Sequence, residues 1–288
     1  MKATNECLVC FIYQAYKSAK IATEDEELQR RIIIEVANQL QYMDMSHSPA
    51  ELSQIIYEIV SNITGNKDPY IKQKKSQNEI ALKIEPALRE LRDKSDDPLL
   101  TSLKLSAEGN VIDLGVLSEH QIDINSILTH ATKINFAVNH YEFFVKDLKH
   151  AKKILFFLDN AGEIVFDKIL IEKLKEYADV TAVVKGKPII NDACIEDAIE
   201  VGLDKVANVI AMEKGWIGAP WRILEKSLLK RMDEANIIIG KGQGNYETLD
   251  DYPGNVYLLL KAKCSVVAKS MGVKEGEIGF ISTRQKSK

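Results

Sequence analysis

Three clusters of polar residues in the second half of the chain contain side chains suited to binding a metal ion. Asp159 and Asn160 open the first cluster, Asn191 and Asp192 lie in the second, and Lys241 belongs to the third. Carboxylate and amide oxygens are the hard ligands that Mg²⁺ and Mn²⁺ prefer in proteins. The residue types therefore predict a divalent cation (Mg²⁺, Mn²⁺, Co²⁺ or Ni²⁺) held by Asp159, Asn160 and Asp192.

The third cluster adds groups that suit an anion. Lys241 brings a positive charge without competing for the metal, while Gly242 and Gly244 let backbone N–H groups approach a ligand where a helix starts. A cation, a lysine and a helix N-terminus together neutralise a phosphate and stabilise the transition state of phosphoryl transfer. We therefore predict that Asp159, Asp192 and Lys241 are catalytic.

Each cluster also has a purely structural interpretation. Asn160 with Glu163 fits a helix N-cap, Asn191 or Asp192 fits the cap of a following helix, and Lys241 fits a solvated lysine. The GKGQGN segment lacks the spacing of a Walker A loop, and no GxGxxG follows the first buried strand. A nucleotide loop of either familiar type is therefore not predicted.

The polar clusters follow segments that read as buried strands. Short apolar runs occupy 153–158, 180–184, 207–212, 236–239, 256–260 and 279–282, and helical patterns occupy 163–177, 193–201, 220–232 and 265–270. This alternation favours a mostly parallel sheet covered by helices on both faces. Ligands of such sheets bind beyond the carboxyl ends of the strands, which is where the clusters lie.

The first part of the chain reads as helical. Helices are expected over 24–41, from Pro49 to about Gly65, and around Ile80 to Leu91, where Pro86 should kink the helix or mark its start. A further helix is expected over 124–149. We predict an α/β protein with an all-α helical domain (1–105), a junction with a helix (106–150) and a three-layer α/β/α sandwich with a mostly parallel, Rossmann-like sheet (151–288).

Composition excludes several classes of protein. The 288 residues carry a net charge of −4, which argues against nucleic-acid binding by bulk charge. No apolar run approaches the roughly 18 residues of a membrane span, and the polar start does not resemble a secretory signal. We expect a cytoplasmic protein with neither a nucleic-acid nor a membrane partner. The sequence leaves open whether it forms a homo-oligomer.

Four cysteines are too few for a disulfide scaffold in a chain of this length. Cys7 and Cys10 form a CxxC pair, and the simplest interpretation is two reduced thiols at the start of a helix. A disulfide, or a metal shared with distant groups, is the alternative. The role of the pair stays open at the sequence level.

The three clusters also resemble a known family. FFLDNAGEIVFD, KGKPIINDACIEDA and GKGQGNYETL are similar to three blocks of the damage-control phosphatases, which include the ARMT-like metal-binding proteins and were long catalogued as a domain of unknown function. ITGNKDPY and EGNVIDLG are similar to other segments of the family, and the early CxxC resembles a pair found in its prokaryotic branch. The resemblance implies a helical domain, an α/β/α sandwich, a divalent metal and hydrolysis of small phosphate esters, such as sugar phosphates or damaged phosphometabolites.

The resemblance also implies roles for individual residues. It places the metal on Asp159, Asn160 and Asp192 and the family's lysine on Lys241. Further site residues that it implies, next to Gly242 and Gly244, are Asn110, Asp113, Glu163 and Asn191.

The leading hypothesis is thus a metal-dependent phosphatase whose partner is a small phosphorylated metabolite. An S-adenosylmethionine-dependent carboxyl methyltransferase and a non-catalytic metal- or phosphometabolite-binding protein are the alternatives.

Overall fold

The computed structural model describes residues 1–110 and 123–285, and its centre is a seven-stranded sheet. Every neighbouring pair of strands is parallel except β6 and β7, which are antiparallel. The strands lie in the order β1 (Phe136–Asn139), β7 (Ile278–Ser282), β6 (Val256–Lys261), β5 (Ile237–Lys241), β2 (Lys153–Phe157), β3 (Asp179–Val184) and β4 (Asn208–Ala211).

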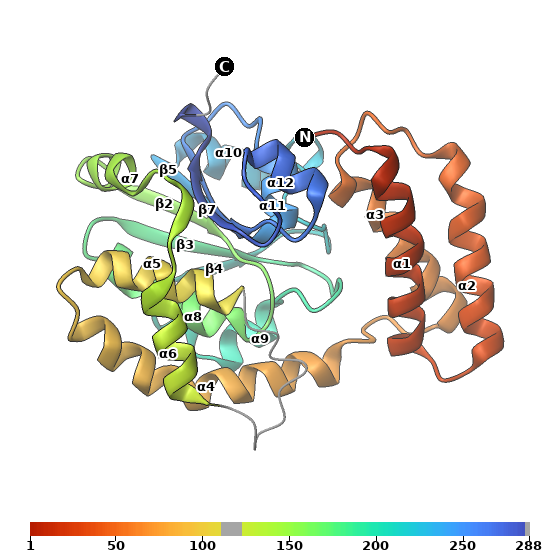
Figure 1. Cartoon of the computed structure of the whole chain (residues 1–288), viewed down its shortest axis with the longest axis horizontal. Helices are drawn as coiled ribbons and strands as arrows, with labels where there is room; N and C mark the ends of the chain where they lie inside the picture. The colour runs from red at the N-terminus through yellow and green to blue at the C-terminus, as the bar shows by residue number, and fades with distance from the viewer. Residues whose placement is uncertain (111–122, 286–288) are drawn as a thin grey trace.

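The strand residues divide between two apolar cores because successive side chains point to opposite faces of a sheet. Phe156 and Ile239 enter the core shared with α8 (Glu163–Leu174) and α9 (Ile195–Glu200). Phe157 and Ile238 enter the core shared with α10 (Lys226–Glu234), α11 (Gly242–Leu249) and α12 (Ser265–Met271). The predicted fold class, a helical part plus an α/β/α sandwich with a mostly parallel sheet, is confirmed (Figure 1).

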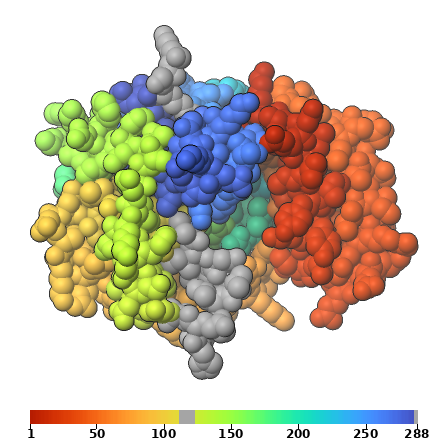
Figure 2. Space-filling view, in the orientation of Figure 1, coloured from red at the N-terminus to blue at the C-terminus, as the bar shows by residue number. Residues whose placement is uncertain are grey.

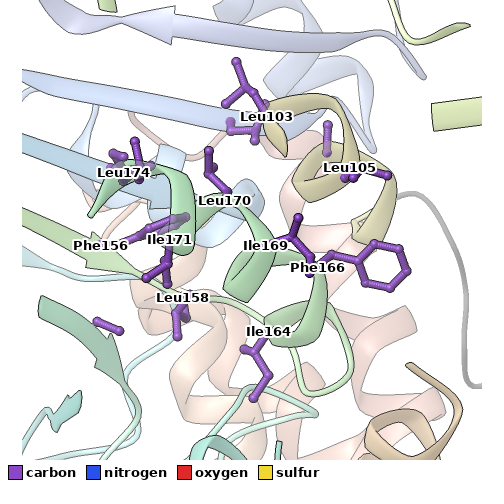
Figure 3. Packing of buried hydrophobic residues seen from close by; sticks show 14 of the residues in the cluster. Leu103, Leu105, Phe156, Leu158, Ile164, Phe166, Ile169, Leu170, Ile171 and Leu174 are labelled. Carbon is purple, nitrogen blue, oxygen red and sulfur yellow. The ribbon is translucent and has the colours of Figure 1, made fainter. Parts of the chain in front are cut away.

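Helix α8 is buried on nearly all sides, because its apolar residues are spread around the helix and even Asp167 and Lys168 are buried. Helices α4 (Ile71–Asp93), α5 (Pro98–Gly109) and α6 (Ile124–Lys133) add side chains to the core around it. Figure 3 shows the apolar side chains of α8 with Phe156 of β2 on one side and Leu103 and Leu105 of α5 on the other. The start of α8, where the first polar cluster lies, is thereby held in place from two directions.

Helices α1 (Asn5–Ala22), α2 (Glu26–Gln39) and α3 (Pro49–Thr64) pack on one another around Phe11, Ile32 and Ile56. This helical unit lies at one end of the molecule, beside α11 and α12 (Figures 1 and 2). The division at residues 105 and 150 stays a prediction. The apolar cores favour a boundary after α3 instead, because α4 and α5 share the core of α8.

The single helix expected over 124–149 is wrong. The segment forms α6, then strand β1, then α7 (Tyr141–Leu148). Strand β1 has only four residues, too few to show an alternating pattern, and it is held by parallel pairing with β7 at the edge of the sheet. Pro86 lies inside α4, which begins at Ile71, so the proline does not mark a helix start.

The helix expected over 220–232 begins later than predicted. A 3₁₀ turn over Trp221–Ile223 comes first, and α10 starts at Lys226. Within the described ranges, no helix is both long and apolar enough to cross a bilayer.

Candidate metal and phosphate site

A cavity of about 560 Å³ lies beyond the carboxyl ends of β2, β3 and β5. The predicted site residues that line it are Asn110, Asp159, Asn160, Glu163, Asn191, Asp192 and Gly244. The structure thus brings together residues from four segments that lie far apart in the sequence. Asp113, which the resemblance also assigns to the site, lies outside the described residues.

Two loops at the ends of β2 and β3 lock the acidic residues side by side. The N–H of Ala193 donates to the carbonyl of Asp159 (2.8 Å), and the N–H of Ala161 donates to the carbonyl of Asn191 (2.8 Å). Asn160 and Asp192 pair as a short β-bridge in the same place. The convergence expected from neighbouring strand ends is therefore fixed by backbone hydrogen bonds.

Two amides connect the carboxylates of the cavity. Asn110 Nδ2 donates to Glu163 Oε1 (2.9 Å) and lies 3.3 Å from Asp159 Oδ2. Asn160 Nδ2 donates to Glu163 Oε1 (2.6 Å) and lies 3.2 Å from Asp159 Oδ2. Because the Asn160 nitrogen faces the protein's own carboxylates, its Oδ1 is the atom suited to an added cation.

Burial, together with the charges of neighbouring carboxylates, raises the pKa of two acids in the cavity. Burial, followed by the charges of Glu163 and Asp192, raises the pKa of Asp159 well above its ordinary value. Burial raises the pKa of Asp192 to about 6, although Lys185 counteracts this. A group of acids in this condition favours an added positive charge.

The donor set fits a hard divalent cation. In the part of the chain that the structure describes, no three His, Cys, Asp or Glu side chains form a ready ligand set, and the amide oxygens of the cavity are the other hard donors beside the carboxylates. Asn110 Oδ1 is buried here without a hydrogen-bond partner, which is unusual for a buried amide. Two carboxylates with amide oxygens beside them match the ligands of Mg²⁺ and Mn²⁺.

Lys241 lies beneath the cavity rather than on its wall. Its fully buried Nζ donates to Asp167 Oδ1 (2.6 Å) and to the Ser106 carbonyl (2.9 Å), and lies 3.7 Å from Glu163 Oε2. Burial alone would lower the pKa of Lys241, but Asp167 and Glu163 raise it. In this geometry Lys241 stays charged and neutralises carboxylates.

Gly242 begins α11 with φ of +77°, in the left-handed region, and does not line the cavity. A Cβ at this position would lie 1.8 Å from Asp159 Oδ2. A glycine is thus required here so that the Asp159 carboxylate can occupy its place. The contact between Gly242 and phosphate that the sequence predicts is a different role.

Three lysines near the carboxylates were not predicted. Lys185 follows β3, and its Nζ lies 3.4 Å from Asp192 Oδ2 and donates to the Gly218 carbonyl (2.7 Å). Lys261 is the last residue of β6 and Lys263 lies just beyond it, and both line the cavity. The sequence signal for this last pair is its position at the carboxyl end of the strand expected at 256–260.

The capping interpretations are wrong. Helix α8 is preceded by Gly162, whose N–H donates to Asn78 Oδ1 of α4 (2.8 Å), so Asn160 does not cap it. Helix α9 is capped by Cys194, whose N–H donates to Asp197 Oδ2 (2.9 Å). Asn160, Asn191 and Asp192 are therefore available to the cavity. Cys7 and Cys10 are free thiols, the former buried and the latter exposed.

The fold and cavity together define an α/β protein with an acidic, amide-rich site at the carboxyl ends of its strands. Residues 3–278 match the damage-control phosphatase ARMT1-like domain, and the chain belongs to this family. The predicted family is confirmed, and with it the class of enzyme, a phosphatase. The family is generally metal-dependent.

Relatives of known class match almost the whole chain. A damage-control phosphatase of Pyrococcus horikoshii is 33% identical over 282 residues, covering 96% of this chain and 97% of the relative. One of Archaeoglobus fulgidus is 35% identical over 285 residues, covering 96% and 98%. A crystal structure of a DUF89 family protein from Pyrococcus horikoshii superposes with a TM-score of 0.90 at 32% identity, covering 98% of this chain and 99% of that one.

Proposed function

We propose that this chain hydrolyses small phosphate monoesters at the cavity formed by Asp159, Asn160, Glu163 and Asp192. The observation that carries the proposal is the convergence of these oxygens at the strand ends, with Asp159 and Asp192 both raised in pKa by burial. A buried group of acids without a matching cation is electrostatically unfavourable, and a divalent ion relieves it. Asp159, Asn160 and Asp192 would hold this ion.

The protein's own groups would orient the substrate. A divalent cation in such a site supplies charge neutralisation and Lewis-acid polarisation of a phosphoryl oxygen. Lys261 and Lys263 bring positive charge to the cavity wall, where an anionic phosphate enters. Asn110 and Lys241 hold Glu163 and Asp167 in fixed positions, so the site is preorganised before substrate arrives.

The test is phosphate release from a panel of phosphate monoesters with Mg²⁺, Mn²⁺, Co²⁺ or Ni²⁺. We expect turnover that depends on the metal and that falls at least 100-fold in Asp159→Ala, together with loss of metal binding by calorimetry. Asp179→Ala is the matched control, because Asp179 is an exposed aspartate at the opposite end of β3. Full metal-dependent activity in Asp159→Ala contradicts the assignment.

Two further outcomes separate the other hypotheses. Tight binding of S-adenosylmethionine without metal, measured by calorimetry, would favour a methyltransferase. Binding of phosphate esters without release of phosphate would favour a non-catalytic binding protein.

A further inference from the structure

A second cavity, of about 340 Å³, lies beside the site cavity. Ile190, Ile217, Gln243 and Gly244 line both cavities. The two cavities therefore adjoin and share part of their walls.

The walls of the second cavity are mainly apolar and come from two parts of the molecule. Phe11 and Ala50 belong to the helical unit α1–α3, and Val266 and Val267 belong to α12. Figure 2 shows the helical unit directly beside the blue C-terminal segments that include α12. The cavity thus exists because the helical unit is docked on the sandwich.

Gln243 and Glu247, two polar residues of the second cavity, already have hydrogen-bond partners. Gln243 Nε2 donates to Glu247 Oε1 (2.9 Å), and Gln243 Oε1 accepts the N–H of Lys263 (3.1 Å). A bound group rich in hydroxyls would compete with these bonds or lose its own hydrogen bonds to water, which is unfavourable. An apolar group neither competes with these hydrogen bonds nor loses hydrogen bonds to water.

Ile190 marks the junction of the two cavities and is held in an unusual backbone conformation. Its φ is +47°, the only positive value at a non-glycine residue in the described ranges. A β-branched residue adopts this conformation only where its surroundings impose it, and such residues cluster at ligand sites. Hydrogen bonds from Asp192 N–H to Ile189 O (3.1 Å) and from Ala161 N–H to Asn191 O (2.8 Å) hold the loop around it.

We propose that the second cavity binds the carbon skeleton of the substrate, and that this skeleton is an apolar chain or ring rather than a polyhydroxylated sugar. The inference rests on the proposed function, since it needs the phosphate to lie in the site cavity. The ester oxygen then joins the phosphate to a group that passes the four shared residues and contacts Phe11 and Val267. The helical unit acquires a function as one wall of the substrate pocket.

The test measures how strongly the purified full-length protein, loaded with Mg²⁺, binds methylphosphonate and hexylphosphonate by calorimetry. These compounds are not hydrolysed, so the measurement needs no turnover. Each buried methylene should tighten binding about fourfold, and we expect hexylphosphonate to bind at least tenfold tighter than methylphosphonate. Equal affinities overturn the proposal.

A substitution that fills the second cavity tests whether the preference for hexylphosphonate arises there. Cys10 lines the second cavity and is exposed, so Cys10→Phe should fill the cavity without disturbing the core and reduce the preference for hexylphosphonate below threefold. Val9→Phe is the matched control on the same helix, because Val9 is 74% exposed and does not line the cavity. An unchanged preference in Cys10→Phe also overturns the proposal.

The two hypotheses fail in different ways. If neither phosphonate binds and no ester releases phosphate, the phosphate site itself is wrong and the inference falls with it. If esters are hydrolysed with the same kcat/KM for butyl phosphate as for a hexose phosphate, the phosphatase stands and only the apolar pocket is wrong.

Discussion

The carboxylate of Asp159 is closely surrounded by its neighbours. Asn110 and Asn160 approach its Oδ2, and burial, followed by the charges of Glu163 and Asp192, raises its pKa. The space for it exists only because residue 242 has no side chain. Small changes around this carboxylate should therefore affect metal binding more than they affect the fold.

Gly242→Ala tests this steric requirement. The added Cβ would lie 1.8 Å from Asp159 Oδ2, so the carboxylate must move, and we expect metal affinity and phosphatase activity to fall at least tenfold. Gly65→Ala is the control, because Gly65 has a similar φ of +71° with no atom within 4 Å of the added Cβ. It should cost about 1 kcal/mol in stability and leave activity unchanged. Equal losses of activity in both variants would show that backbone strain, not the collision, is responsible.

The sequence predicts individual site residues where they directly follow a buried strand. Asp159 and Asp192 were found because polar residues directly follow buried apolar runs. The burial of Lys241 could not be found in this way, because the partner that holds it, Asp167, is one turn into α8 and carries no signal of its own.

At the scale of elements, α8 connects the site to the core. It is buried by the sheet on one side and by α4 and α5 on the other, and its Asp167 bonds both Lys241 of β5 and Ser106 of α5. The buried pair of Lys241 and Asp167 thus joins three elements beneath the cavity. Removing one partner of this pair should therefore lower the free energy of unfolding.

Lys241→Met leaves Asp167 as a buried charge without its main partner. We expect a loss of about 3–5 kcal/mol in the free energy of unfolding, measured by urea denaturation, and a smaller loss in Lys241→Met/Asp167→Asn, because the uncompensated charge is gone. Arg222→Met removes an exposed pair with Asp251 (2.7 Å) and should cost about 1 kcal/mol or less. A double variant no more stable than the single one would argue against the charge as the cause.

Elements with a long apolar pattern could be predicted, and those defined by tertiary pairing could not. The strands at 153–157 and 256–261 are continuous apolar runs that lie in the middle of the sheet. Strand β1 has only one buried residue, Phe136, and depends on β7, which is far away in the sequence. Its neighbours α6 and α7 are helical, so a helix through the whole segment was the natural but wrong expectation.

The whole molecule consists of a sandwich with a helical unit docked beside α11 and α12. Ser265 Oγ donates to Glu6 (2.7 Å), Gln54 Nε2 donates to the Gly215 carbonyl (3.1 Å), and the Met1 ammonium bonds the Glu247 carbonyl (3.1 Å). The sequence indicated the helical unit by its amphipathic stripes, but not this docking, which depends on complementary surfaces. The side chain of Glu247 is buried at the interface.

Glu247 should make stability depend on pH. Burial raises its pKa from 4.5 to about 7, although Gln243 and the Ala50 N–H, together with the charge of the Met1 ammonium, act in the opposite direction. The folded state therefore binds more protons than the unfolded state between about pH 4.5 and 7, so the free energy of unfolding falls as the pH rises through this range. Ionisation of Glu247 costs about 3 kcal/mol at most above pH 7.

Glu247→Gln keeps an oxygen for the Gln243 and Ala50 N–H groups but removes the charge. We expect its stability relative to the unsubstituted protein to increase by up to about 3 kcal/mol between pH 5 and pH 8, measured by urea denaturation at both values. Glu234→Gln is the control, because Glu234 is exposed and Lys153 lowers its pKa, so its difference should be small and of opposite sign. A pH-independent difference for Glu247→Gln would mean that this carboxyl is already hydrated, and that the interface between the helical unit and the sandwich is open in solution.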